Sequence, residues 1–176
     1  MVLLTGLRRS DMQAMPWADV NLTDGYISLP GPRGGPERAF RIPISAPMRR
    51  CLERAKQAGK LLAEPQAKTW VFPAETSESG HIEEPKGDVE GRSPHALRHT
   101  FRGMCAGAKV TKLHSRLLMN HKISNDIHDE YMTVPAMFDQ FREASEAAAA
   151  YITGHLPRGA WRALDRRLRE DLKDPN

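Results

Sequence analysis

The sequence predicts a mainly α-helical α+β domain with a small antiparallel sheet at its edge. Three observations lead to this fold class. The chain has 176 residues, 40% hydrophobic and 27% charged, which suits one globular domain with a buried core. Two short segments on either side of residue 35 alternate apolar and polar side chains as strands do. Several longer segments, most of them after residue 93, carry apolar residues at the helical period.

The N-terminal third contains the expected sheet. Residues 3–7 are apolar, and the side chains that follow as far as residue 17 have the spacing of a short helix. Residues 19–22 open an extended region. Tyr26–Leu29 and Ala39–Ile44 alternate like strands, and the Gly/Pro-rich connection 30–36 predicts that they form a hairpin.

The middle of the chain is expected to hold one helix and one exposed loop. Ser45–Leu62 fits a helix with Met48, Leu52 and Leu62 near one face. Trp70–Pro73 is a short apolar piece, either strand or buried coil. The segment 74–91 is rich in Ser, Glu, Gly and Pro and is typical of a surface loop.

The C-terminal half is expected to be helical. Ser93 is a candidate cap and Pro94 suits the first turn of a helix over 95–106. The other expected helices are Val110–Met119, Asp126–Met132 and Met137–Tyr151. The short join at Gly107 also fits a DNA-reading helix-turn-helix, a weaker interpretation. We expect one domain over 1–156 and a charged tail over 157–176.

Composition excludes several classes of protein. No apolar run approaches the roughly 20 residues of a membrane-spanning helix. The two cysteines, Cys51 and Cys105, form neither a disulfide framework nor a metal-binding spacing. The sequence therefore predicts a cytoplasmic protein that uses no metal and no cofactor, and that has no membrane partner.

The net charge of +4 becomes informative when it is divided along the chain. Residues 1–60 carry a net +5 and residues 92–122 a net +7, whereas 61–91 and 123–150 carry −5 each. Two basic segments separated by an acidic one suggest a fold that gathers positive charge on one surface, as a polyanion would require. Ordinary surface patterning explains the charge distribution equally well.

Three short clusters carry residues suited to chemistry on a phosphodiester. Arginine can hold two non-bridging phosphate oxygens and offset developing negative charge. Histidine exchanges protons near neutral pH, and tyrosine becomes a nucleophile when cations lie beside it. The candidate residues are Arg8 after the Thr5-Gly6-Leu7 turn, His95 and Arg98 three positions apart on one helix, and His121 followed ten residues later by Tyr131.

In this order and spacing, the clusters resemble the catalytic domain of a tyrosine recombinase, the phage-integrase type of site-specific recombinase. The matching boxes are Thr-Gly-Leu-Arg-x-x-acid, His-x-Leu-Arg-His, and x-His with a tyrosine about ten residues on. The resemblance also covers the hairpin ending Arg41-Ile42-Pro43-Ile44 and the helix after the tyrosine, so it spans roughly residues 3–152. Each box alone is a weak signal, and all of them in order are specific.

The resemblance implies a role for each catalytic residue. Arg8 and Arg98 would clamp the scissile phosphate, and His121 would donate a hydrogen bond to it. His95 would handle the proton of the nucleophile Tyr131, which would form a 3′-phosphotyrosine and release a 5′-hydroxyl. Strands of double-stranded DNA would then be exchanged without metal or ATP by a homo-oligomer, a tetramer, during integration or excision of a mobile element.

Single positions depart from the family pattern. The family usually has Glu where Asp11 stands, and His99 and Asn120 are variants, Asn120 in place of a more frequent glycine. A hairpin lysine that serves as general acid would fall at Gly35, and Arg33 is the nearest basic residue. Lys68 and Lys86 lie outside the hairpin and would have to reach in.

The front of the chain departs as well, because the family's first helix and its N-terminal DNA-clamping domain do not precede Arg8. We therefore expect a fragment or an isolated domain.

Two other functions compete with recombination. One is a non-catalytic DNA-binding remnant of an integrase, and the other is nicking and closing like that of type IB topoisomerases. A zinc site formed by His95, His99 and His121 is a minor alternative, since no acidic or thiol ligand accompanies these histidines.

Overall fold

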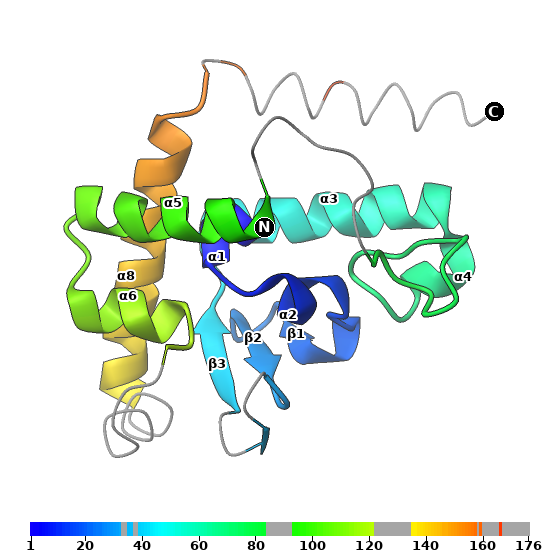
Figure 1. Ribbon diagram of the computed structural model, residues 1–176, viewed down its shortest axis with the longest axis horizontal. Helices are drawn as coiled ribbons and strands as arrows, with labels where there is room; N and C mark the ends of the chain where they lie inside the picture. Colours follow the sequence, from blue (N-terminus) through cyan, green and yellow to red (C-terminus); the bar gives the residue numbers. More distant parts are fainter. Residues whose placement is uncertain are drawn as a thin grey trace.

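The computed structural model describes residues 1–32, 35–36, 39–83, 93–121, 135–157, 159 and 166, and the structural statements below concern these residues. They form a mainly helical α+β fold with a small antiparallel sheet, which confirms the predicted class at this level (Figure 1). The predicted helix over 126–132 and the candidates Arg33, Lys86 and Tyr131 lie outside the described residues. The helices and strands of the described residues are α1 (Val2–Thr5), α2 (Arg9–Gln13), a 3₁₀ turn (Trp17–Asp19), β1 (Val20–Asn21), β2 (Tyr26–Leu29), β3 (Phe40–Pro43), α3 (Ala46–Leu62), α4 (Glu64–Ala67), α5 (Pro94–Gly107), α6 (Lys112–Leu118) and α8 (Pro135–Gly154).

The sheet has the order β1-β2-β3 with both pairings antiparallel, so the predicted hairpin of the second and third strands is confirmed. The register pairs Ile27 with Ile42, and both side chains are buried. Because successive side chains of a strand point to opposite faces, this register turns one face of the sheet toward the core.

Helix α3 follows the sheet directly, and Pro47 in its first turn suits a helix start. Met48 and Leu52 lie on its buried face. Leu62, which was expected on that face, is 72% exposed, so that prediction is wrong. Leu62 is the last residue of the helix, where the chain turns away into α4.

Helix α5 has the predicted cap, since the Ser93 hydroxyl oxygen accepts a hydrogen bond from the Ala96 N–H at 3.2 Å. Phe101 and Cys105 are fully buried along its inner face. Helix α5 packs against both α1 and α8 (Figure 1). These contacts decide where the residues of its first turns lie.

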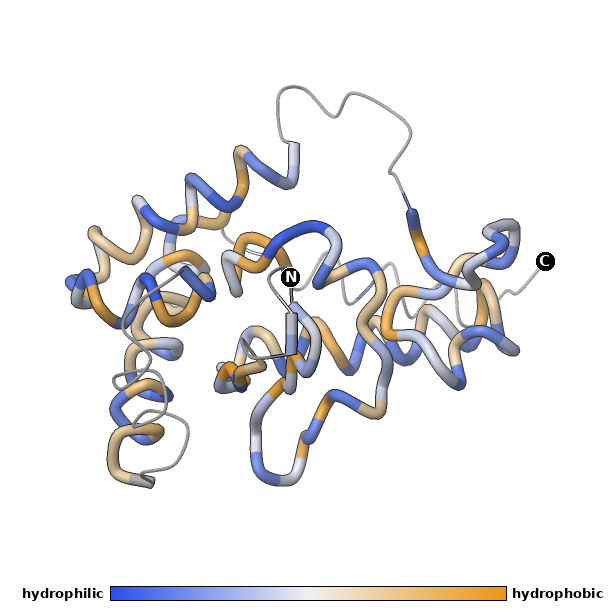
Figure 2. The backbone as a smooth tube through the Cα atoms, turned by 60° about the horizontal axis from the view of Figure 1, so that its bottom comes forward, coloured by the Kyte–Doolittle hydropathy of each residue, from blue (hydrophilic) through white to orange (hydrophobic). Residues whose placement is uncertain are grey.

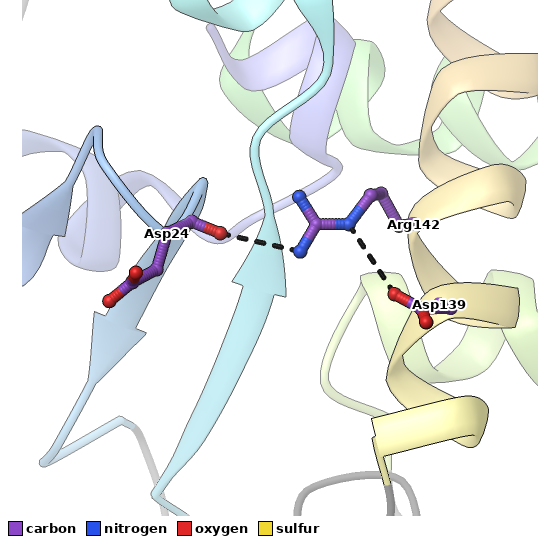
Figure 3. A network of polar contacts seen from close by, with 3 residues as sticks. All are labelled: Asp24, Asp139 and Arg142. Atoms are coloured by element: carbon purple, nitrogen blue, oxygen red, sulfur yellow. Dashed lines mark hydrogen bonds and ion pairs between the residues drawn. The ribbon is translucent and has the colours of Figure 1, made fainter.

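Helix α8 packs closely because its buried face carries small residues, among them Ala148 and Ala149. The buried Ser145 hydroxyl donates to the Pro43 carbonyl at 3.2 Å, which ties α8 to β3. Arg142 reaches across to the turn after β1: its Nη2 donates to the Asp24 carbonyl at 3.3 Å and its Nε lies 3.9 Å from Asp139 Oδ1 (Figure 3). These contacts hold the sheet against the C-terminal helix.

The segment 70–73 contributes two isolated bridges, Pro16 with Trp70 and Pro73 with His81, so it is paired coil rather than a strand of the sheet. Val71 at its centre is fully buried.

Apolar and polar residues alternate along the helices, as Figure 2 shows. Within the described ranges, none of the helices has the length and apolar character needed to cross a membrane.

Candidate anion-binding site

The first element of the site is the turn between α1 and α2, which presents Arg8. Gly6 ends α1 in the left-handed conformation with φ 62°, and its N–H donates to the Val2 carbonyl. The Thr5 hydroxyl accepts a hydrogen bond from the Leu7 N–H at 3.2 Å, which fixes the turn from inside. Arg8 then adopts an extended backbone and occupies the N-cap position of α2. The Thr-Gly-Leu-Arg sequence thus works as one local structural unit.

The turn sits directly on α5 and on the residue after α6. A β-carbon at Gly6 would lie 2.8 Å from Met119 Cγ and would overlap the ring of Phe101. Both of these neighbours are fully buried, so neither has open space to move into. Glycine is therefore required here for two reasons: the backbone has a positive φ, and Phe101 and Met119 lie too close for a β-carbon.

Arg98, on α5, links the turn between α1 and α2 to the residue after α6. Its guanidinium donates through Nη1 to the Gly6 carbonyl and through Nη2 to the Met119 carbonyl at 2.7 Å. Partial burial lowers the pKa of Arg98 to about 10, with a further lowering from the positive charge of Arg8 and an opposing effect from Asp11. The side chain stays protonated at neutral pH, so a positive charge is held in place by two backbone carbonyls.

The third element is the end of α6, which presents His121. Asn120 has φ 46°, a left-handed conformation that glycine and asparagine adopt most readily. This backbone requirement accounts for the residue type at position 120. The His121 N–H then donates to the Arg116 carbonyl at 2.8 Å, which places the imidazole immediately after the helix.

His121 lies in a strongly positive environment. Its pKa is lowered to about 4, first because of partial burial and then because of the charges of Arg98, Arg8, Arg102 and Arg116. Each of these effects disfavours the protonated ring. At neutral pH the imidazole is therefore neutral, and it sits where several arginine charges add up.

Arg8 completes the site with a buried donor. Its Nη1 is buried and has no hydrogen-bond acceptor among the described residues. Asp11, one helical turn later, offsets part of the charge, yet burial raises the pKa of its carboxyl above the usual value despite Arg8 and Arg98. A buried guanidinium N–H normally has a partner. The arrangement of Arg8, Arg98 and His121 therefore suits an anion with several acceptor oxygens.

The structure brings three of the five predicted catalytic residues within electrostatic reach of one another: Arg8, Arg98 and His121. His95 is exposed at the start of α5, and its Nε2 lies 2.9 Å from His99 Nε2. Tyr131 stays a prediction, because it lies outside the described residues. Lys68, considered as a distant general acid, is exposed and lies 3.9 Å from Glu64.

Sequence reasoning missed Arg102 and Arg116, whose charges also act on His121. The available signal was the acid-free span 92–122, which located positive charge without saying which side chains face the site. It also missed the carbonyls of Gly6 and Met119, because backbone acceptors leave no trace in residue type. The described part of the chain holds no group of three or more His, Cys, Asp or Glu able to bind a metal, so the three-histidine zinc site is not formed there.

Comparison of the chain with protein-family models, with curated proteins and with solved structures finds no match.

Proposed function

We propose that this domain binds the sugar–phosphate backbone of double-stranded DNA at Arg8, Arg98 and His121, and that it breaks and rejoins one strand through Tyr131. The observation that carries this proposal is the buried Arg8 Nη1, which has no acceptor among the described residues, beside the protonated Arg98 and the neutral His121. A phosphodiester offers two non-bridging oxygens to such donors. The resemblance of the sequence boxes to tyrosine recombinases supplies the reaction class.

Each residue then has a defined task. Arg8 and Arg98 hold the non-bridging oxygens, and His121 donates a hydrogen bond while it remains uncharged. The Tyr131 oxygen attacks phosphorus, its proton passes to His95, and the bond from phosphorus to the 5′ oxygen breaks. The 5′ oxygen takes up a proton from solvent and leaves as a hydroxyl. Attack by another strand's 5′-hydroxyl on the phosphotyrosine reverses these steps and completes the exchange.

The proposed partners are double-stranded DNA and further copies of the same chain, as a homotetramer on DNA. The net charge of +7 over 92–122 supports a polyanion partner, since this span contributes Arg98, Arg102 and Arg116. Phosphate contacts dominate such binding and release counterions. We therefore expect DNA affinity to fall steeply as salt increases.

A covalent trapping experiment tests the proposal. Nicked duplexes with a randomised core serve as suicide substrates. Cleavage beside the nick releases a short oligonucleotide that carries the 5′-hydroxyl. This oligonucleotide diffuses away, so the protein stays attached to the DNA. We expect denaturant-resistant protein–DNA adducts with the wild-type chain and none with Tyr131→Phe. Tyr151→Phe, which removes a half-buried hydroxyl at the far end of α8, serves as the matched control and should keep the adduct.

The two other candidate functions give distinct outcomes in the same assay. A DNA-binding remnant, favoured by Gly35 at the position expected for the acid lysine, would bind the duplexes without any adduct. Topoisomerase-like activity would give adducts together with relaxation of supercoiled plasmids of any sequence. An adduct that persists in Tyr131→Phe would contradict the proposed nucleophile.

A further inference from the structure

Two histidines of α5 form a pair outside the anion-binding site. His95 and His99 are four residues apart, both are exposed, and their Nε2 atoms lie 2.9 Å apart. Their rings stand nearly perpendicular, at 82°, with centroids 4.5 Å apart. A hydrogen bond between two neutral imidazoles needs one N–H and one lone pair. At least one Nε2 lone pair is therefore already directed into the space between the rings.

The separation of the two nitrogens fits two neighbouring ligands of one metal ion. Imidazole nitrogens bind transition metals at about 2.0–2.1 Å. Two nitrogens at the observed 2.9 Å would then subtend an angle of about 90° at the ion. That is the angle between adjacent ligands in square-planar and octahedral sites, which Cu²⁺ and Ni²⁺ prefer.

We propose that His95 and His99 together bind a divalent transition metal ion of the imidazole-preferring class, with Cu²⁺ and Ni²⁺ favoured and water completing the coordination. The ion replaces the proton between the two rings, and the ring that donated this proton carries it on Nδ1 instead. Because both side chains are exposed, their rings are free to rotate so that both lone pairs point at the ion.

The charges around the pair determine which ions can bind. Arg102 lies three residues after His99 on the same helix and is exposed, and Arg98 follows His95 by three residues. The pair also occupies the first two turns of α5, where the helix dipole disfavours cations. A hard cation such as Mg²⁺ would gain too little from two nitrogens to overcome this field. Ions with strong bonds to imidazole are selected instead, Cu²⁺ before Ni²⁺.

Metal binding at this pair would affect strand cleavage. This effect rests on the proposed function, whereas the metal site itself does not. His95 Nε2 cannot accept the proton of Tyr131 while it is bound to a metal ion. Metal binding would therefore inhibit strand cleavage, and a chelator would reverse the inhibition.

Calorimetric titration of the chain with CuCl₂ or NiCl₂ in a non-coordinating buffer tests the metal site. It does not depend on any DNA cleavage by the chain. We expect one ion per chain. Loss of even an outer partner of a metal ligand costs about 10- to 100-fold in affinity. His95→Gln and His99→Gln should therefore each bind at least about tenfold more weakly, whereas His155→Gln, just after α8, should bind like the wild type.

A second measurement uses the wild-type chain and needs no variant. Paramagnetic Ni²⁺ should broaden the imidazole NMR signals of His95 and His99 before those of His81, His114 and His155. Binding that is unchanged in both glutamine variants, or broadening centred on other histidines, would overturn the proposal. Metal binding by a chain that forms no DNA adduct would leave the site standing and would refute only the proposed function.

Discussion

Replacing Arg98 with lysine is expected to lower the rate of DNA adduct formation by about 10²- to 10³-fold, the cost of removing one preorganised donor to a developing charge. Lysine keeps the positive charge but cannot reproduce the planar fork. In the structure this fork holds the Gly6 and Met119 carbonyls at the same time. The ammonium group is a single nitrogen on a flexible stem, so it cannot hold both carbonyls in this geometry, and its position against a phosphate is no longer fixed.

The same change should also weaken the fold. An acceptor left without its donor in a partly buried site costs about 1–3 kcal/mol. Adduct formation must therefore be measured at a temperature where circular dichroism shows the variant to be folded. Arg102→Lys, on the same helix and exposed, is the matched control and should change the rate far less. A folded Arg98→Lys variant that cleaves at the wild-type rate would refute the role of the fork.

Gly6→Ala is expected to lower the free energy of unfolding by about 2–5 kcal/mol. A left-handed backbone costs a residue with a β-carbon about 1–2 kcal/mol. Overpacking of a filled core adds about 1–3 kcal/mol, and here the new methyl group would overlap the Phe101 ring and lie 2.8 Å from Met119 Cγ. Since the Gly6 carbonyl also accepts from Arg98, the change should disturb the site as well as the fold.

Denaturant unfolding of Gly6→Ala and Gly25→Ala separates the two costs. Gly25 has φ 74°, but a β-carbon there meets only the far end of the flexible Arg142 side chain. We expect Gly25→Ala to lower the free energy of unfolding only by the cost of the left-handed backbone, about 1–2 kcal/mol. Equal losses in both variants would show that the close packing at Gly6 contributes nothing.

The local elements could be predicted from sequence because their signals are local. The hairpin partners Tyr26–Leu29 and Phe40–Pro43, the Ser93 cap and the helix after it all follow from alternation, period and capping chemistry. Short elements were missed where few residues define them. The four-residue helix α4 and the division of the first segment at Gly6 into α1 and α2 are of this kind.

The site was only partly predictable, because its key contacts are long-range. The charge pattern and the sequence boxes pointed to Arg8, Arg98 and His121. Nothing in residue type shows that Arg98 is held by the carbonyls of Gly6 and Met119, 92 and 21 positions away. Likewise the pairing of His95 with His99 depends on side-chain orientation, which helical spacing permits but does not require.

The central claim is that Arg8, Arg98 and His121 converge on one anion. The pH titration of the His121 imidazole, followed by NMR with and without vanadate as a phosphate mimic, tests it most directly. The folded chain should show a His121 pKa near 4, far below the usual 6.5, because burial and the arginine charges disfavour the protonated ring. A bound anion offsets those charges, so vanadate should raise this pKa. His155, exposed just after α8, serves as the internal reference, and its NMR signals should not respond to vanadate. A His121 that titrates near 6.5 and does not respond to vanadate would contradict the account.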